Sequence, residues 1–477
     1  MQEVLHKKIS RALISVSDKE GVAHLAKELV NNGVEIIASD GTAAFLKDSG
    51  VEVKTVTEVT GSPELLGGKV KTLHPLIHAA LLADQNNPQQ IAELKGLGSI
   101  DLLVINLYPT SGFDIGGPAL TRAAAKNSEH VAVITAPNQY PELINSLKLG
   151  TTLEQRKEWA VSALLLTAKY DLALLKELSA PLRYGENPHQ DGALATSNHH
   201  QVLQGKAMSF NNYLDLQAAW ELSRSCEKAV AIVKHGIPSG LAQADSSTKA
   251  FKMAWACDPV SAFGGVVVST LEIDAECAAE IIKGFVEVVA ANEINEEALK
   301  IFATKPNLRV VTLAVPAKDK FAIREIDGGY LFQSKDNFDN AGDRFENWQL
   351  VSGAAADEKT AMDLLLAWRI AGKARSNAVV LVRDCASIGI SAGNVSRVDA
   401  ARLAIYKANE FNKSMLAGSV AASDGFFPFP DGVEALIASG VAAIVQPGGS
   451  LKDDAVIAAA QAAGVTMYLT GQRHFSH

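Results

Sequence analysis

Short apolar runs alternate with amphipathic segments along the first 150 residues. Four of these runs predict buried strands: residues 11–16, 34–38, 102–107 and 131–135. Between the first two, apolar residues recur at helical spacing, at Val22, Leu25, Ala26 and Leu29. We expect this helix to be capped by Asp18 and to end near Gly33, and a further helix to cover 42–49. Apolar strands separated by helices indicate an α/β fold with a parallel sheet covered on both faces.

A long helical segment follows the predicted sheet. Thr151 and Glu154 have capping-box spacing, which places its start there, and it is expected to end near residue 180. The Pro- and Gly-containing stretch 181–192 comes next, so we predict two domains, 1–180 and 181–477. The second is again α/β, with apolar strands at 229–233 and 379–382 and an alternation of helix and strand over 433–469.

Composition narrows the class of protein. The chain has 477 residues, 48% of them hydrophobic, which allows more than one core. The formal net charge of −9 argues against a nucleic-acid coat but not against small anionic ligands. The start has no signal-peptide pattern and no apolar run is long enough to span a membrane, so we expect a cytoplasmic protein. Cys226, Cys257, Cys277 and Cys385 lack paired spacing and are expected to be buried free thiols.

Three polar clusters in the first domain suggest an anion site. Ser15–Lys19 and Ser39–Thr42 lead from strand ends into helix starts, where unpaired N–H groups favour phosphate. Lys69–Pro75 adds two lysines and a hydroxyl. Taken singly, each cluster is more often a plain helix cap or a solvated face. Together at the carboxyl ends of strands, they favour phosphate binding.

A second group could handle protons at a carbonyl centre. Tyr108 and Asp114 follow the 102–107 strand, and Lys126 comes shortly after them. Alone, Tyr108 is equally well a core-edge aromatic and Asp114 a turn residue. These spacings do not name a reaction.

Motifs in both domains resemble the bifunctional family that joins an AICAR (aminoimidazole carboxamide ribotide) formyltransferase to an IMP cyclohydrolase. The cyclohydrolase motifs are Ser15–Lys19, Lys71–Pro75, Asn106–Pro109, Asp114–Pro118 and Ala123–Asn127. The transformylase motifs are Arg183–Gln190, Lys234-His235, Asp258–Gly265, Ser376–Ala378, Ser396–Asp399, Ser423–Phe429, Arg473, Phe475 and His477. They occur in family order over essentially the whole chain.

The resemblance implies a fold, an activity and partners. It implies a methylglyoxal-synthase-like domain with a parallel sheet, followed by two cytidine-deaminase-like α/β subdomains. The activity would be formyl transfer from 10-formyltetrahydrofolate to AICAR, then dehydrative closure to IMP, the last two steps of de novo purine biosynthesis. It implies small-molecule substrates, no catalytic metal, no membrane or nucleic acid, and a homodimer with active sites across its interface.

The resemblance also assigns roles to residues. In formyl transfer, His235 would take the amine proton, and Lys234 would stabilise the oxyanion or protonate the folate nitrogen. In ring closure, Lys126 would be the main proton-transfer residue, with Asp114, Tyr108 and Lys71 also catalytic. The substrate-binding residues would be Ser17, Asp18, Lys19, Ser39, Asp40, Gly41, Thr42, Lys69, Thr72, Ile105, Asn106 and Ile115 in the first domain, and Arg183, Tyr184, Asn377, Arg397, Phe426, Asp431, Ser450, Leu451 and Arg473 in the second.

Several positions depart from the family pattern. Asp40 stands where the family has Gly, which places a carboxylate beside the expected anion site and implies backbone strain. Lys69 replaces an Arg, and the 109–113 segment is short, which leaves the separation of Tyr108 and Asp114 open. In the transformylase, Ile237 and Ser239 replace Asn and Cys, and Asn394-Val395 replaces Gln-Met.

These departures keep two alternatives open. In one, the chain is a transformylase only, and an impaired cyclohydrolase domain acts as a nucleotide-binding module. In the other, the N-terminal domain is a ligand sensor, as in regulatory relatives of this fold. The presence of Lys71, Tyr108, Asp114 and Lys126 weighs against the sensor.

Overall fold

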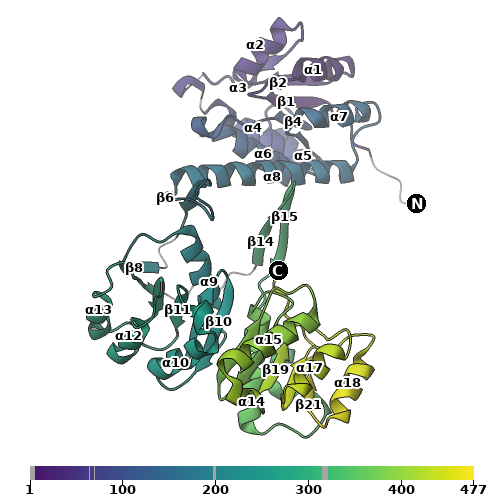
Figure 1. The fold of residues 1–477 in the computed structure, drawn as a ribbon. Helices are drawn as coiled ribbons and strands as arrows, with labels where there is room; N and C mark the ends of the chain where they lie inside the picture. Colours follow the sequence, from purple (N-terminus) through teal and green to yellow (C-terminus); the bar gives the residue numbers. More distant parts are fainter. Residues whose placement is uncertain (1–5, 64, 69, 197–199, 314–320) are drawn as a thin grey trace. The chain divides into compact units, whose positions relative to one another are not determined.

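The chain forms two compact units, which a computed structural model describes for residues 6–63, 65–68, 70–196, 200–313 and 321–477 (Figure 1). Unit 1 is Met1–Ser179 and unit 2 is Ala180–His477. No helix among the described residues is both long and apolar enough to cross a membrane. All four cysteines are free thiols; Cys226, Cys257 and Cys277 are buried as expected, but Cys385 is only partly buried.

Unit 1 has five strands and eight helices among its described residues. The strands are β1 (Arg11–Ser15), β2 (Glu35–Ala38), β3 (Lys54–Thr55), β4 (Leu102–Ile105) and β5 (Ala132–Ile134). The helices are α1 (Val22–Asn31), α2 (Asp40–Asp48), α3 (Val56–Thr60), α4 (Pro75–Leu82), α5 (Pro88–Glu93), α6 (Gly116–Lys126), α7 (Tyr140–Ser146) and α8 (Leu153–Leu178). Four 3₁₀ turns complete it: η1 (Leu66–Gly68), η2 (Lys71–Leu73), η3 (Thr110–Gly112) and η4 (Pro137–Gln139).

The sheet of unit 1 is parallel, in the order β3-β2-β1-β4-β5. Alternate residues of each strand enter different cores: Ala12 and Ile14 pack on one face, and Leu13 packs on the other. Helices therefore cover both faces, and the predicted parallel α/β domain is confirmed. The strand order reverses direction at β1 and β4, the position at which such sheets bind ligands.

Two predicted helix caps of unit 1 are wrong. Helix α1 has Gly21 at its N-cap, with φ +68°, and Asp18 instead accepts a hydrogen bond from the Glu20 N–H (3.0 Å). The capping box of α8 is Thr152 with Gln155, not Thr151 with Glu154. Both pairs have the same spacing in the sequence, so the burial of Thr151 decides which pair forms the cap. Thr151 is buried and pairs through its backbone with Lys7, which leaves the cap to the next residue.

Unit 2 has sixteen strands and ten helices among its described residues. The strands are β6 (Ala180–Leu182), β7 (Gly192–Leu194), β8 (His200–Gln204), β9 (Ala229–Lys234), β10 (Ile237–Gln243), β11 (Val266–Ser269), β12 (Val288–Ala291), β13 (Arg309–Leu313), β14 (Phe321–Ile326), β15 (Gly329–Ser334), β16 (Gln349–Ser352), β17 (Val379–Arg383), β18 (Ala386–Ser391), β19 (Val420–Ser423), β20 (Ala443–Gln446) and β21 (Thr466–Leu469). The helices are α9 (Phe210–Arg224), α10 (Ser247–Cys257), α11 (Pro259–Ala262), α12 (Ala275–Ile281), α13 (Glu296–Phe302), α14 (Glu358–Lys373), α15 (Arg397–Phe411), α16 (Lys413–Leu416), α17 (Asp431–Ala438) and α18 (Asp453–Ala462). Two 3₁₀ turns are η5 (Ala341–Asp343) and η6 (Phe345–Asn347).

One mixed sheet of twelve strands runs through unit 2, and its two halves repeat one topology. The order β10-β9-β11-β12-β13 in the first half matches β18-β17-β19-β20-β21 in the second, and each begins with an antiparallel hairpin followed by three mutually parallel strands. The halves join where β10 pairs with β18. Helices α9 and α14 cover one face and share a core through Trp220 and Trp368. This larger mixed-sheet region follows the parallel-sheet domain, as the fold prediction required.

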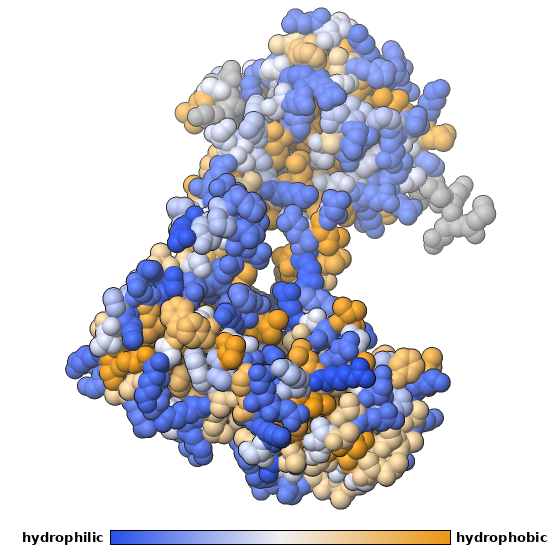
Figure 2. Space-filling model, viewed as in Figure 1, coloured by the Kyte–Doolittle hydropathy of each residue, from blue (hydrophilic) through white to orange (hydrophobic). Residues whose placement is uncertain are grey.

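A two-stranded ribbon, β14–β15, stands apart from this sheet. It carries several exposed apolar side chains, part of which Figure 2 shows as orange surface: Phe321, Ile323, Ile326, Leu331 and Phe332. Apolar side chains on both strands of an isolated ribbon are typical of a surface that another chain covers.

Candidate active sites

Polar side chains gather where β1 and β2 end in unit 1. The Thr42 hydroxyl oxygen accepts hydrogen bonds from the Val16 N–H (3.2 Å) and from Lys19 Nζ (3.1 Å). The Ser39 hydroxyl lies 3.2 Å from both the Thr42 and the Ser15 hydroxyls. The structure therefore brings two of the three predicted anion clusters together. Gly41 lies beside them in the first turn of α2, which begins at Asp40 rather than at residue 42.

Asn106, the residue after β4, binds the loop that follows β1. Its Oδ1 accepts from the N–H groups of Ser17 (2.5 Å) and Asp18 (3.0 Å), and its Nδ2 donates to the Asp18 carbonyl (2.9 Å). Ile105, the residue before it, is buried at the end of the strand. The Asn106 side chain thus fixes the loop after β1 against the end of β4.

Lys19 is a partly buried cation at this edge. Burial lowers the pKa of its ammonium, and the nearby Asp18 carboxylate opposes that shift. A bound phosphate would act in the same direction as Asp18, because a nearby anion favours the charged form of a lysine. An anion bound at this edge would therefore stabilise the charged form of Lys19.

Asp40 contacts the third predicted anion cluster, Lys69–Pro75, through Lys71. Its Oδ2 forms an ion pair with Lys71 Nζ at 2.7 Å, and both side chains are partly buried. Its Oδ1 is buried and has no hydrogen-bond partner among the described residues, which exclude Lys69. Asp40 begins α2 and is not among the described non-glycine residues with positive φ, so the expected backbone strain is wrong. The carboxylate itself lies next to the predicted anion clusters, as the sequence suggested.

The short 109–113 segment brings Asp114 to Tyr108. Asp114 accepts hydrogen bonds from the Gly117 N–H (2.7 Å) and the Tyr108 N–H (3.2 Å), and its own N–H donates to Tyr170 Oη (2.8 Å). A side chain at Gly117 would collide with the Asp114 carboxylate. Tyr108 is 59% exposed, so its side chain is accessible to a ligand.

Thr72 and Ile115 lie near Asp114, at the start of α6. A side chain at Gly116 would collide with the Thr72 hydroxyl, so Thr72 lies against the start of α6. Ile115 precedes that helix and is mostly exposed. Residues from four of the predicted motifs thus surround one edge of the unit 1 sheet.

Lys126 does not lie at this edge. It is the last residue of α6, whereas Asp114 precedes the first. An 11-residue helix separates its ends by about 15 Å, well beyond the reach of a lysine side chain. Within one chain, the structure keeps Lys126 apart from Asp114 and Tyr108.

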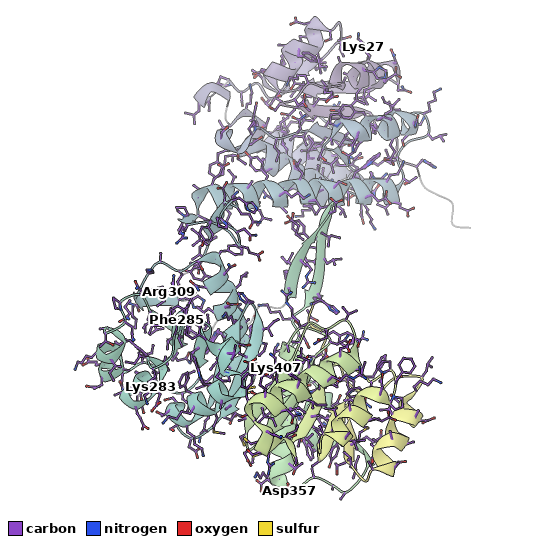
Figure 3. The ribbon with its side chains drawn as sticks, in the orientation of Figure 1. Lys27, Lys283, Phe285, Arg309, Asp357 and Lys407 are labelled. Atoms are coloured by element: carbon purple, nitrogen blue, oxygen red, sulfur yellow. The ribbon has the colours of Figure 1, made fainter. Side chains whose placement is uncertain are left out.

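Lys234 and His235 lie at the hairpin between β9 and β10 in unit 2. Lys234 ends β9, and its Nζ donates to the Phe263 carbonyl at 2.7 Å. Phe263 follows α11 and packs against Phe285, which Figure 3 labels, with tilted rings whose centroids lie 5.2 Å apart. Asp258 caps α11 and pairs with Lys407 (3.0 Å), which holds that carbonyl in place.

His235 borders a cavity of about 520 Å³. The other lining residues are Glu186, Asn187, Asn211, Leu214, Asp215, Ala218, Glu221, Gly236, Lys373, Arg375, Ser476 and His477. Among the predicted site residues of the described chain, His235 alone lines it. Asp215 and Arg375 were missed, because a lone Asp on a helix and an Arg before a turn carry no sequence signal of their own.

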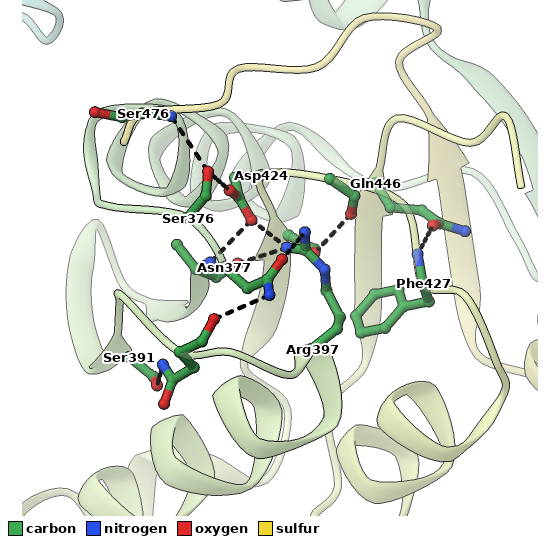
Figure 4. A network of polar contacts seen from close by, with 12 residues as sticks. Ser376, Asn377, Ser391, Arg397, Asp424, Phe427, Gln446 and Ser476 are labelled. Atoms are coloured by element: carbon green, nitrogen blue, oxygen red, sulfur yellow. Dashed lines mark hydrogen bonds and ion pairs between the residues drawn. The ribbon is translucent and has the colours of Figure 1, made fainter. Parts of the chain in front are cut away.

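Asn377 and Arg397 belong to a buried polar network around Asp424 (Figure 4). Arg397 pairs with the Asp424 carboxylate and donates to Asn377 Oδ1 (2.6 Å). The Ala378 N–H also donates to Asp424, at 2.9 Å. The Arg397 guanidinium and the Asn377 amide therefore make their described hydrogen bonds to protein groups, since Asn377 Nδ2 donates to the carbonyls of Asn394 (2.9 Å) and Val395 (3.0 Å).

The other predicted residues of unit 2 lie outside these contacts. Arg183 stacks on Tyr184, 4.7 Å from its ring centroid, and Arg473 stacks on Phe475 at 4.6 Å. Phe426 is half-buried, Asp431 begins α17, and Ser450 and Leu451 lie in an exposed loop before α18.

His474 anchors the C-terminal segment. Its buried ring lies between two carboxylates, with Nδ1 2.7 Å from Asp336 and Nε2 2.6 Å from Asp343. Ser476 then pairs with Ser376, whose hydroxyl donates to Asp424. The C-terminal segment is thereby tied to the Asp424 network.

The contacts of His474 with Asp336 and Asp343 predict a pH dependence of stability. Burial opposes protonation of His474, but hydrogen bonds to Asp336 and Asp343 outweigh it and raise the pKa from 6.5 to about 9. Because the folded state binds this proton more tightly than the unfolded state, protonated His474 contributes its full stabilisation below pH 6.5. This stabilisation is lost as the pH rises through 9 and the imidazole loses its proton. We expect the free energy of unfolding to fall by on the order of 3 kcal/mol over that window. Urea unfolding of the wild type should show this slope, and His474→Gln should lack it.

No three or more His, Cys, Asp or Glu side chains in the described part of the chain are arranged to hold a metal ion.

Comparisons with known proteins match both units. A family model described as AICARFT/IMPCHase bienzyme matches residues 124–407, and one described as MGS-like domain matches residues 21–133. Two relatives named bifunctional purine biosynthesis protein PurH, from Mycobacterium marinum and Mycobacterium ulcerans, are 44% and 43% identical to this chain. A third, from Corynebacterium glutamicum, is 42% identical. Each alignment covers 99% of this chain and 99% of the relative.

Proposed function

Because the chain belongs to the AICARFT/IMPCHase bienzyme family, we propose that unit 2 formylates AICAR and unit 1 closes the product to IMP. Family membership makes the protein a bifunctional purine biosynthesis enzyme with AICAR formyltransferase and IMP cyclohydrolase activities. Formyl transfer requires a formyl-folate co-substrate, which we propose to be 10-formyltetrahydrofolate. A cytoplasmic location is proposed with it, supported by four cysteines that are free thiols.

In formyl transfer, His235 is proposed as the base. The AICAR amine is a weak nucleophile because its lone pair is delocalised, so it must lose a proton as it attacks the formyl carbon. His235 lines a cavity large enough for a small ligand, and Lys234 precedes it on the same turn. The Lys234 ammonium would stabilise the oxyanion and pass a proton to the departing folate nitrogen.

In ring closure, the edge of the unit 1 sheet is proposed to hold formyl-AICAR. Its phosphate would lie against Ser39, Thr42 and Lys19, whose hydroxyls and ammonium converge there. Asp114 and Tyr108 would then border the reacting carboxamide and formyl groups. Holding those groups in near-attack geometry supplies much of the acceleration, and water is the leaving group.

Asp40 is expected to weaken ribotide binding in unit 1, because its carboxylate pairs with Lys71 at 2.7 Å. Asp40→Asn removes the competing charge and should tighten formyl-AICAR binding about fivefold, the equivalent of about 1 kcal/mol. Isothermal titration measures this directly. Asp48→Asn, at the other end of α2, changes the net charge equally and should leave the affinity unchanged. Weaker binding by Asp40→Asn would contradict the idea.

A homodimer is proposed as the working form. Its support is the exposed apolar ribbon β14–β15 and the separation of Lys126 from Asp114 along α6. If Lys126 acts in ring closure, it must reach the site of another chain. Sites that draw on both subunits of a symmetric dimer meet this requirement.

The observation that carries the proposal is His235 at a cavity beside Lys234, in a chain whose family performs formyl transfer. Purified protein is incubated with AICAR and 10-formyltetrahydrofolate, and formyl-AICAR is separated from IMP. IMP should form. Accumulation of formyl-AICAR without IMP, beyond slow uncatalysed closure, would favour a transformylase alone, and no formyl-AICAR at all would overturn the proposal.

A further inference from the structure

The two halves of unit 2 each contain a two-residue turn in a left-handed conformation. In the first half, His235 and Gly236 join β9 to β10 with φ of +55° and +69°. In the second, Asp384 and Cys385 join β17 to β18 with φ of +54° and +59°. Such turns match the twist of a hairpin, but they are unfavourable for residues other than glycine. Each turn therefore needs contacts that hold it.

An aspartate on the preceding helix supplies the contact in both halves. In the first, Asp215 of α9 accepts a hydrogen bond from the Gly236 N–H at 2.6 Å. In the second, Asp363 of α14 accepts from the N–H groups of Asp384 (2.9 Å) and Cys385 (2.7 Å). The helix, the hairpin and the contact between them are thus repeated.

The first turn faces the cavity described above. Asp215, His235 and Gly236 all line the 520 Å³ cavity. In the second half, Asp384 pairs with Lys359, and Arg383 donates to the Ala417 carbonyl. The turn of the first half carries the imidazole of His235, and the described contacts of the second turn are with its own side of the sheet and with α14.

We propose that Asp215 is a positioning residue for formyl transfer: its hydrogen bond to the Gly236 N–H holds the turn that directs His235 into the cavity. This rests on the proposed function, because it takes His235 as the base. Asp215 acts through the backbone, so the oxygen acceptor matters and its negative charge does not. A base displaced by a fraction of an ångström from its proton loses much of its effect.

Three variants of the full-length protein test this. Asp215→Ala removes the acceptor and should lower kcat of formylation by roughly tenfold to hundredfold, with little change in KM for AICAR. Asp215→Asn keeps a carbonyl oxygen and should stay within about threefold of the wild type. Asp363→Ala removes the matching contact from the second turn, and its kcat per folded molecule should be unchanged. Closure of supplied formyl-AICAR should be normal in all three.

Hydrogen exchange gives a readout that is independent of turnover. The Gly236 amide should exchange faster in Asp215→Ala than in Asp215→Asn or the wild type. The proposal is overturned if Asp215→Ala formylates within about threefold of the wild type, or if Asp215→Asn is as impaired as Asp215→Ala. A wild type that fails to formylate AICAR, with Gly236 still protected by Asp215, would instead overturn the proposed function and the catalytic part of this inference with it.

Discussion

Replacing His235 with alanine is expected to abolish formyl transfer and to leave ring closure intact. The imidazole is the one group at the cavity that is proposed to accept the amine proton, and general-base catalysis supplies about a hundredfold to ten-thousandfold. His235 has a left-handed φ of +55°, which is unfavourable for any residue other than glycine, and alanine brings no β-branch and no greater bulk into that turn. Formylation should therefore fall by at least about a hundredfold.

The same polypeptide contains the control for this experiment. Closure of supplied formyl-AICAR is proposed to take place in unit 1, which shares no described side chain with the cavity, so its conversion to IMP should match the wild type. Stopped assays with AICAR and 10-formyltetrahydrofolate measure the first reaction, and absorbance of IMP measures the second. Formylation that persists within about tenfold of the wild type would show that another group is the base.

The sequence predicted strands and loops well because their signals are local. Apolar runs such as 102–107 identify a strand buried on both faces, and β4 lies within that run. Ser39 and Thr42 converge with Lys19 because parallel strands end at the same edge. Such convergence follows from topology alone, so the pattern of strands and helices was enough to join anion clusters that lie far apart in the chain.

The sequence could not predict features that depend on contacts between residues far apart in the chain. The Asp40–Lys71 pair joins residues that are 31 apart, and only packing decides whether the carboxylate points toward the lysine. The repeat within unit 2 is hidden because its halves share a topology rather than motifs: His235 and Asp384 occupy matching turns. The role of Asp215 follows from that repeat, which only the folded chain displays.

Lys126 shows how the fold restricts an assignment made from resemblance. In a parallel α/β sheet, a helix that follows a strand begins at the carboxyl edge and ends at the other edge. Helix α6 follows β4 in this way, so Asp114 lies at the ligand edge and Lys126 at the opposite end. In this structure one chain does not bring both residues to the same edge, so we expect a role for Lys126 in closure to draw on a second chain.

Lys126→Ala is expected to lower ring closure by at least about a hundredfold while formylation remains normal. Asp114→Asn, which keeps an oxygen for the Gly117 N–H, should also be deficient in closure. Mixing the two variants by co-expression makes heterodimers in which one of two sites has both native residues. Because half of randomly paired dimers are mixed, about a quarter of wild-type closure should return. If Lys126→Ala alone is impaired and the mixture restores nothing, Lys126 acts within its own chain, and the position of α6 must change when substrate binds.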